Sequence, residues 1–445
     1  MNRRGFRLLQ VADAFVLYGA ALAIMFIRFR LDWPSYRVEA YLVSFAVTTF
    51  VFQLGLYFAG LYEREPRLGS PALLPRIGRS LLGAGGFIAL LNLSATGIAR
   101  ELGFTTQRAL PMPIVNLVAL MAVSTLLLAM NRQAAMRLRS HREGPPRAVL
   151  LGSPDDLRLA QEHIEAVGDR VIVVARVGDR EGLERAIAEH DPTDVLVLSR
   201  AMLEKVHPDP ITGLANRGIT VLHRVGALET MFGLQRIREV GGLPFVLLRS
   251  RWLPLSRRRF KRSLDLTYTV LAAPVWVPVL LLVALHQLVV AGRPILFRQT
   301  RVGAGGEHFR MVKFRTMRVG AEEDGRPRLA TIGDERIIPA CRWVRARRLD
   351  ELPQLLHVLR GEMSLVGPRP ERPELTEVFE QELPSYRQRH EVPPGITGLA
   401  QVNGRYHTDA SYKLGYDLQY LASWSAVLDL EILFRTVLVM LRRGG

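Results

Sequence analysis

The sequence contains a single cysteine, Cys341, among its 445 residues. One thiol excludes an intrachain disulfide and a zinc site built from several cysteines, and it fits a reducing compartment. Acidic residues are also scarce, because 42 Asp and Glu stand against 59 Lys and Arg, which gives a formal net charge of +17. Such a surplus suits nucleic acid, an anionic membrane surface or phosphorylated substrates, and composition alone does not choose among them.

Hydrophobic residues make up 49% of the chain and are concentrated in long runs. Crossing a bilayer takes about 20 predominantly apolar residues, and four stretches reach that length: 7–29, 39–62, 78–99 and 111–131. The first follows Met1-Asn2-Arg3-Arg4 and has no small-residue cleavage site, which is typical of an anchor rather than a removed signal peptide. The sequence therefore predicts a domain of four transmembrane helices over residues 1–135.

The arginines predict which side of the membrane each loop occupies, because cytoplasmic loops are enriched in Lys and Arg. With the N-terminus inside, the cytoplasmic segments hold twelve arginines: Arg3, Arg4, Arg7, Arg64, Arg67, Arg76, Arg79, Arg132, Arg137, Arg139, Arg142 and Arg147. The outside loops hold five: Arg28, Arg30, Arg37, Arg100 and Arg108. We therefore expect a multi-pass membrane protein with everything after residue 132 in the cytoplasm.

Residues 145–245 have the alternating pattern of a small Rossmann-like, doubly wound α/β domain. The expected strands are Arg147–Gly152, Val171–Val177, Asp194–Leu198 and Ile219–His223, and the expected helices include 155–167 and 180–190. The first strand runs into Gly152-Ser153-Pro154-Asp155-Asp156 rather than a Gly-x-Gly-x-x-Gly loop. Two acids and a proline there disfavour a pyrophosphate, so we expect a regulatory or dimerising domain without a dinucleotide.

Another apolar run, Leu264–Gly292, is uncharged after Asp265 and contains Pro274 and Pro278. Basic residues flank both of its ends, so both ends have the character of cytoplasmic segments. Proline inside a helix produces a kink or a break. Residues 257–292 are therefore predicted to form a re-entrant hairpin that dips into one leaflet; the alternative is an ordinary fifth crossing, which would put the rest of the chain outside the cell.

The remaining residues, 293–445, are basic and rich in turn signals, and they contain an adjacent acidic pair, Asp350 and Glu351. Read alone, such a pair followed by Pro353 is also typical of a helix start. Adjacent side chains diverge on a helix, however, so one acid could attack while the other holds a metal. Pyrophosphate chemistry needs arginine, backbone amides and magnesium, and the nearby basic groups are Arg298, Arg301, Lys313, Arg315, Arg369 and Arg405.

Ordered motifs over residues 261–441 resemble the bacterial sugar transferase family, the monotopic phosphoglycosyl transferases. They are Lys261-Arg262-x-x-Asp265, Pro294-Ile295-x-Phe297-x-Gln299-x-Arg301-x-Gly303, Lys313-Phe314-Arg315-Thr316-Met317, Leu349-Asp350-Glu351-Leu352-Pro353-Gln354-Leu355, the Gly361–Pro370 segment, Pro394-Gly395-Ile396-Thr397-Gly398-x-x-Gln401-Val402-Asn403-Gly404-Arg405 and Tyr416-Asp417-x-x-Tyr420. The whole chain resembles the long form of the family. The implied fold is a membrane α-helical bundle, a Rossmann-like α/β domain and a re-entrant-helix monotopic α/β catalytic domain.

The resemblance implies a reaction and assigns residues to it. Asp350 would be the nucleophile, Glu351 would help to bind Mg²⁺, and Arg369 would engage substrate phosphate. The other implied substrate-binding residues are Arg301, Lys313, Arg315, Gln401, Asn403 and Arg405. A UDP-sugar, with galactose or glucose as the usual unit, would give its sugar 1-phosphate to undecaprenyl phosphate and release UMP, which initiates exopolysaccharide, capsule or O-antigen synthesis.

The expected partners are the UDP-sugar, undecaprenyl phosphate, the lipid bilayer and a second copy in a homodimer, with no nucleic acid. A catalytically inactive scaffold of a priming complex is the alternative, and it predicts loss of the acidic pair, which is present. A nucleotide-sugar dehydratase or epimerase would need a glycine loop and a Tyr-x-x-x-Lys pair in the middle domain, and residues 145–245 contain neither. Two positions depart from the family pattern: Ala273 precedes Pro274 where serine is common, and His357 replaces a common asparagine.

Overall fold

The computed structural model describes residues 3–30, 38–63, 68, 73–101, 113–167, 171–207, 210–226, 237–248, 253–321, 334–383, 385–403 and 409–442. The chain divides into two compact units, Met1–Ser250 and Arg251–Gly445. The predicted domains 1–135 and 145–245 fall in the first unit, and 257–292 and 293–445 fall in the second.

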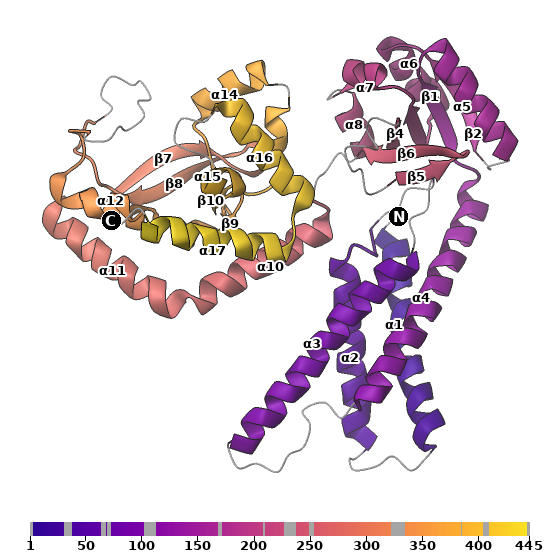
Figure 1. Ribbon diagram of the computed structural model, residues 1–445, viewed down its shortest axis with the longest axis horizontal. Coiled ribbons are helices and arrows are strands. Elements are labelled where there is room, and N and C mark those ends of the chain that lie inside the picture. The colour runs from indigo at the N-terminus through magenta and orange to yellow at the C-terminus, as the bar shows by residue number, and fades with distance from the viewer. Residues whose placement is uncertain are drawn as a thin grey trace. The chain divides into compact units, whose positions relative to one another are not determined.

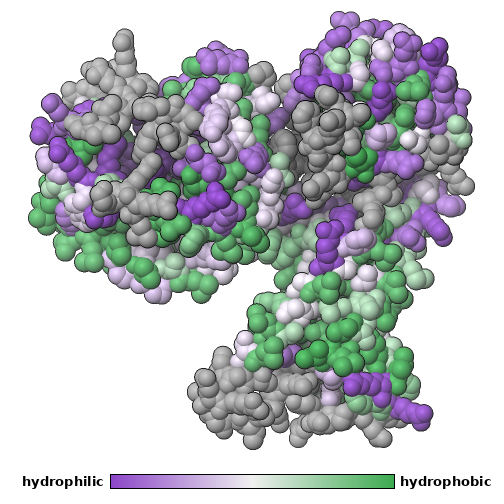
Figure 2. All heavy atoms as spheres, viewed as in Figure 1, coloured by the Kyte–Doolittle hydropathy of each residue, from purple (hydrophilic) through white to green (hydrophobic). Residues whose placement is uncertain are grey.

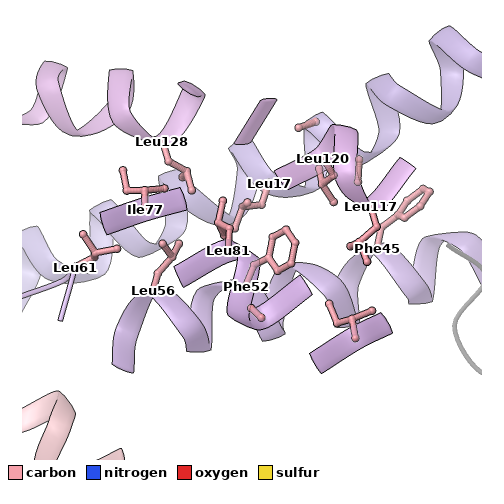
Figure 3. Close-up of a cluster of buried hydrophobic side chains, with 14 of the residues drawn as sticks. Leu17, Phe45, Phe52, Leu56, Leu61, Ile77, Leu81, Leu117, Leu120 and Leu128 are labelled. Atoms are coloured by element: carbon pink, nitrogen blue, oxygen red, sulfur yellow. The ribbon is translucent and has the colours of Figure 1, made fainter. Parts of the chain in front are cut away.

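The first unit begins with four long helices: α1 (Arg3–Phe29), α2 (Val38–Phe58), α3 (Leu73–Glu101) and α4 (Ile114–Glu143). They coincide with the four predicted apolar stretches, although α4 continues about three turns past residue 131. Figure 3 shows their shared core, in which Leu17, Phe52 and Leu81 pack side by side. The outer surface of the bundle is also apolar (Figure 2), as a helix bundle surrounded by lipid requires.

One buried ion pair ties the first helix of the bundle to the last. The Arg132 guanidinium lies 3.0 Å from the Asp13 carboxylate, and both side chains are almost fully buried. Asn131 donates a hydrogen bond to Asp13 Oδ1 over 2.8 Å. The ion pair and this bond offset part of the cost of burying a carboxylate between apolar helices.

The rest of the first unit is a six-stranded sheet with the order β2-β1-β3-β4-β6-β5. Strands β1 (Arg147–Leu151), β2 (Ile172–Val177), β3 (Asp194–Val197) and β4 (Thr220–Arg224) are parallel neighbours, as the alternating pattern predicts. Four helices lie among them: α5 (Pro154–Val167), α6 (Arg180–His190), α7 (Arg200–Val206) and α8 (Ile211–Asn216). Strands β5 (Ile237–Val240) and β6 (Leu243–Leu248) add an antiparallel hairpin that the sequence pattern did not predict.

The loop after β1 is closed by side chains of the domain itself. Ser153 Oγ contacts Asp156 Oδ2 at 2.7 Å, and the Arg224 guanidinium lies 3.2 Å from the same carboxylate. In dinucleotide-binding relatives of this topology, the corresponding loop presents backbone amides to a pyrophosphate. Here the Asp156 carboxylate, paired with Arg224, lies at this loop instead.

The second unit opens with α10 (Leu255–Leu271) and α11 (Ala273–Val290), which meet in a bend at Ala272 (Figure 1). At the bend, the indole N–H of Trp276 donates to the Thr269 carbonyl over 2.9 Å. This bond occupies a carbonyl that a continuous helix would satisfy with its own backbone. Only 11% of the α11 apolar stretch is buried, so most of it needs an apolar surrounding outside the unit.

Both ends of the α10–α11 hairpin are attached to the same globular body. In α10, Lys261 Nζ lies 2.9 Å from Asp429 and 3.6 Å from Asp265, and Asp265 accepts a bond from Ser364 Oγ over 2.8 Å. At the end of α11, Arg315 donates to the carbonyls of Ala291 and Gly292. The 18-residue α11 spans about 27 Å, and the hairpin is thus attached to one protein unit both through α10 and at the end of α11.

The rest of the unit consists of short strands, single turns and helices of up to 17 residues. They are the antiparallel pair β7 (Leu296–Val302) and β8 (His308–Phe314), η2 (Pro339–Cys341), α12 (Arg342–Ala346), η3 (Leu349–Glu351), α13 (Gln354–Arg360), α14 (Pro373–Glu382), η4 (Tyr386–Glu391), α15 (Leu399–Asn403), α16 (Ala410–Ser423), α17 (Ala426–Arg442) and the parallel pair β9 (Ser364–Val366) and β10 (Gly395–Thr397). The core between them includes Met311, Val358 and Tyr420.

Candidate active site

The acidic pair lies in η3, a single turn between α12 and α13. Arg348, the residue before this turn, has a left-handed backbone with φ of +54°. Such a conformation is uncommon for a residue other than glycine and reverses the chain direction sharply. It delivers Asp350 into the protein, where the residue is only 6% exposed, and presents Glu351 to a neighbouring cleft.

The two carboxylates have different electrostatic surroundings. The pKa of Asp350 is raised to about 7, mainly by burial and also by the neighbouring Glu351 carboxylate, although Lys313 and Arg345 act in the opposite direction. Burial also acts to raise the pKa of Glu351, but Arg369 and Arg348 outweigh that effect and hold it below its ordinary value. Opposite shifts in neighbouring carboxyl groups are a common sign of separate chemical roles.

Arg369 is the main ion-pair partner of Glu351, with its guanidinium 3.0 Å from Oε1. The backbone carbonyl of Arg369 accepts a 2.9 Å bond from Arg389, a buried guanidinium that is also 2.8 Å from Asp417. The loop that carries Arg369 is therefore fixed from behind. The motif Tyr416-Asp417-x-x-Tyr420 is visible in the sequence, but nothing in the sequence indicated that Asp417 and Arg389 meet beneath this loop.

Glycines fix the same loop from the other side. The Gly367 amide donates to the Thr397 carbonyl over 2.8 Å, and the Gly395 amide donates to the Pro368 carbonyl over 2.9 Å. A Cβ atom on Gly367 would lie 2.8 Å from the Pro393 carbonyl oxygen, and one on Gly395 would lie 2.1 Å from the Gly367 nitrogen. Two chain segments can approach this closely only because neither residue has a side chain.

Two predicted basic residues lie on the β7–β8 hairpin beside the acidic pair. Lys313 is largely buried; burial lowers its pKa, while the nearby Asp350 carboxyl acts in the opposite direction. Arg301 donates to the Pro370 carbonyl over 3.0 Å and to Gln299 over 2.7 Å. The structure thus brings together Asp350, Glu351, Arg369, Lys313 and Arg301, which lie in three separate parts of the sequence.

The other predicted site residues lie elsewhere or only border this cluster. Gln401 lines the cleft next to Glu351 and donates to the Ile396 carbonyl over 3.1 Å. Asn403 bonds to the Leu399 carbonyl and accepts from Arg435. Arg315 donates to the Pro294 carbonyl as well as to the end of α11, so in this structure its guanidinium stabilises the end of the α10–α11 hairpin. Arg405 lies outside the described residues.

Sequence reasoning missed two arginines next to the acidic pair. Arg348 lies 3.8 Å from Glu351, and Arg345 acts on the pKa of Asp350. The signal that could have found them is the basic run Arg345-Ala346-Arg347-Arg348, which directly precedes the acids. His357, in contrast, accepts from the Val312 amide and contacts Glu362, so it joins α13 to β8.

A cleft of about 180 Å³ opens beside Glu351, between α13, α15 and α17. Glu351 and Arg348 form its charged end, with Thr397, Gln401 and Thr436 as further polar lining. The rest of the lining is apolar: Leu352, Leu355, Ile396, Val402, Val439 and Met440.

The donor set fits a magnesium ion. Among the described residues, no group of three or more His, Cys, Asp or Glu side chains gathers at one point. Mg²⁺ does not need such a group, because it commonly takes one or two carboxylates and completes its shell with water and substrate phosphates. Glu351 offers an ionised carboxylate at the cleft, and its two arginine partners hold that carboxylate in place.

The part of the chain that holds the acidic pair is similar to known sugar transferases. The family model of the bacterial sugar transferases matches residues 256–443. A UDP-N-acetylgalactosamine-undecaprenyl-phosphate N-acetylgalactosaminephosphotransferase of Aeromonas hydrophila is 40% identical over 188 residues, which are 42% of this chain and 44% of that protein. A UDP-glucose:undecaprenyl-phosphate glucose-1-phosphate transferase of Escherichia coli K12 is 40% identical over 207 residues, 45% of this chain and 44% of that protein.

A third similar protein is shorter. It is a UDP-glucose:undecaprenyl-phosphate glucose-1-phosphate transferase of Caulobacter vibrioides, 41% identical over 211 residues, which are 46% of this chain and 74% of that protein. In the first two comparisons the matching part spans less than half of the relative's length. The family match at residues 256–443 lies within the second unit, which holds the acidic pair.

Proposed function

The chain belongs to the bacterial sugar transferase family, and from that premise we propose that it transfers a sugar 1-phosphate from a UDP-sugar to undecaprenyl phosphate and releases UMP. The observation that carries the proposal is the acidic pair itself: two neighbouring carboxylates with oppositely shifted pKa values beneath Arg369. Galactose and glucose are our preferred donor sugars. The product would initiate exopolysaccharide, capsule or O-antigen synthesis.

In the proposed first step, an Asp350 carboxylate oxygen attacks the phosphorus that bears the sugar. The bond from this phosphorus to the UMP oxygen breaks, UMP leaves with the electron pair, and an aspartyl-phosphosugar remains. Lys313 and Arg369 lie where they can bind the phosphate oxygens. Glu351 would hold Mg²⁺, which when bound neutralises the charge of the pyrophosphate.

In the proposed second step, an oxygen of undecaprenyl phosphate attacks the same phosphorus. The bond to Asp350 breaks, and the carboxylate is regenerated. Burial supports this use of Asp350, because a poorly solvated carboxylate with a pKa of about 7 is more basic than an ordinary aspartate. It also limits the access of water, which would hydrolyse the acyl phosphate.

We place the protein in the bacterial inner membrane with the second unit in the cytoplasm. The arginine distribution supports this orientation. The attachment of both ends of α10–α11 to one body supports a re-entrant hairpin, which would hold the active site where a soluble donor meets a lipid acceptor. A homodimer through the first unit is the proposed assembly, and a monomer in native mass spectrometry from gentle detergent would contradict it.

The test is UMP release from a panel of UDP-sugars by the purified protein with Mg²⁺ and undecaprenyl phosphate. Asp350→Asn should abolish release, and Asp409→Asn, on an exposed residue at the start of α16, should leave it unchanged. Full activity of Asp350→Asn would refute the nucleophile, and UDP in place of UMP would indicate an ordinary glycosyl transferase. No release from any donor would favour an inactive scaffold.

A further inference from the structure

The cleft beside Glu351 has both charged and apolar residues in its lining. Arg348 and Glu351 lie at its charged end, next to the acidic turn. Leu355 of α13 and Val439 and Met440 of α17 belong to its apolar part. A ligand can place an anionic group between Arg348 and the Mg²⁺ that Glu351 would hold, and a hydrocarbon segment against the apolar lining.

The apolar part of the cleft adjoins an apolar surface of the same helix. One face of α17 packs into the core through Ile432, and the other leaves large apolar side chains exposed, at Val427, Leu430, Phe434 and Val437. Their spacing of three and four residues is that of a single helical face. Met440 of the cleft follows Val437 by three residues, which places the two side chains at neighbouring positions on the helix surface, so the exposed apolar face continues to the cleft lining.

The size of the cleft limits what it can hold. Sites for drug-sized ligands occupy roughly 300–1,000 Å³, and this cleft measures about 180 Å³. It can take only the end of a long hydrocarbon chain, whose remainder must lie elsewhere. A chain that continues along the exposed apolar face of α17 and into a bilayer satisfies this requirement.

We propose that the cleft between α13, α15 and α17 binds the phosphate-proximal isoprene unit of the acceptor, with Arg348 facing the acceptor phosphate. This inference rests on the proposed function. It assigns the acceptor to one side of the acidic turn and leaves the side of Lys313 and Arg301 to the donor pyrophosphate. Charge complementarity favours this occupant, because Arg348 meets the phosphate while the apolar lining meets the chain.

The experiment separates the two half-reactions of the full-length protein in micelles. Exchange of labelled UMP into UDP-sugar, without acceptor, reports the donor half-reaction, and product formation against undecaprenyl phosphate concentration reports the acceptor. Val439→Trp fills the cleft and should raise the KM for undecaprenyl phosphate by about tenfold, the effect of losing a few buried methylene contacts. Its exchange rate should equal that of the wild type.

Val378→Trp is the matched control, since the same substitution at an exposed position of α14 lies outside both the cleft lining and the apolar face of α17, and it should change neither quantity. Val439→Ser, which makes the cleft more polar without filling it, should also raise the acceptor KM, and it serves if the tryptophan variant does not fold. A wild-type acceptor KM in both Val439 variants would overturn the inference. So would loss of UMP exchange in folded Val439→Ser, because the cleft would then bind the donor.

Failure of the proposed function would look different. A wild-type protein that releases no UMP with any donor and acceptor would refute the transferase reaction itself. A wild-type protein that forms product but shows no UMP exchange would refute the aspartyl intermediate and leave the acceptor KM comparison intact.

Discussion

At the scale of single residues, Asp350 and Glu351 are neighbours in the chain whose pKa values shift in opposite directions. Asp350 is the more deeply buried carboxyl, and Glu351 has Arg369 and Arg348 beside it. A buried carboxylate with a raised pKa costs stability whenever it is ionised. At neutral pH the proposed nucleophile is therefore partly neutral and partly ionised, and the ionised form is the one that costs stability.

This cost gives a prediction for the metal-free protein. The pKa of Asp350 rises from 3.8 to about 7 on folding, so its unfavourable contribution is small at pH 4, grows as the pH rises toward 7, and is nearly complete at pH 8. Asp350→Asn, which cannot ionise, should therefore raise the thermal midpoint at pH 8 and change it much less at pH 4. Thermal unfolding in EDTA at both pH values tests this. An equal shift at both would point to packing rather than ionisation.

Arg348 gives a second prediction, because its backbone and its side chain can be tested separately. A left-handed conformation costs a residue other than glycine about 1–2 kcal/mol, so Arg348→Gly should be more stable than Arg348→Ala by about 1 kcal/mol. Both variants lose the guanidinium and should raise the acceptor KM equally. Thermal unfolding and product formation measure the two effects.

Arg345 is the control for that comparison. It lies in α12, where alanine is favoured over glycine by about 1 kcal/mol. Arg345→Ala should therefore be more stable than Arg345→Gly, the reverse of the order at Arg348. The same order at both positions would contradict the left-handed conformation.

Sequence motifs indicated the identity of the acidic pair but not its surroundings. Local spacing can show that Asp350 and Glu351 are adjacent, and resemblance can suggest what they do. The burial of Asp350, the ion pair from Arg369 and the support from Arg389 depend on segments far apart in the chain. Arg315 illustrates the same limit, because an arginine beside a basic motif was expected at the site and instead binds the carbonyls at the end of α11.

At the scale of elements, the long helices were the most predictable part of the molecule. Apolar runs of about 20 residues leave few alternatives, and the four stretches coincide with α1 to α4. The hairpin β5–β6 was missed because its strands are short and one of them, Ile237–Val240, has two adjacent polar residues among its four and so lacks the alternation of a strand. Such short runs carry little periodic signal.

The bend between α10 and α11 was predicted from Pro274, but the bond that closes it was not. Ala273 lacks the hydroxyl that a serine would supply, and the Trp276 indole instead donates to the Thr269 carbonyl. This contact spans seven residues and depends on a bend that must already be present. It therefore cannot be read from helical spacing.

The bend provides a third prediction. Pro274→Ala restores a backbone donor, and Trp276→Phe removes one hydrogen bond worth about 1 kcal/mol. Together they should favour a straight helix that crosses the membrane and moves the C-terminus outside. Alkaline phosphatase fused after residue 445 should then become active in intact cells. Pro278→Ala, one turn further along α11, should leave the fusion inactive, and an inactive fusion with the double variant would contradict the role of the bend.

At the scale of the whole molecule, the chain consists of two units with separate cores. Leu17, Phe45 and Leu128 belong to the bundle, and Met311, Val358 and Ile432 belong to the second unit. The predicted hairpin 257–292 and the predicted catalytic region 293–445 share one unit because Lys261 and Asp265 of α10 bind Asp429 and Ser364. The sequence alone predicted the hairpin and the catalytic region as two separate domains, because the hairpin is apolar and the catalytic region is polar.

The division predicts that the proposed reaction does not require the first unit. Residues 251–445, expressed alone in bacterial membranes, should form the lipid-linked sugar from the donor identified for the full chain, because this segment includes the family match and the acidic pair. Radiolabelled transfer into extracted lipid is the measurement. The same segment with Asp350→Asn is the control. A folded segment without activity would assign the first unit a part in catalysis.

The close approach of Gly367 and Gly395 has a consequence for how such enzymes diversify. Any side chain at either position would collide with backbone atoms of the other segment, so the loop that presents Arg369 admits almost no substitution there. An enzyme that evolves to use a new donor sugar must therefore keep this loop and change other residues of the active site. The similar proteins differ in the sugar that their names give, glucose in two and N-acetylgalactosamine in one. The residues that determine which sugar each protein prefers should thus lie outside this loop, at positions where substitutions are tolerated.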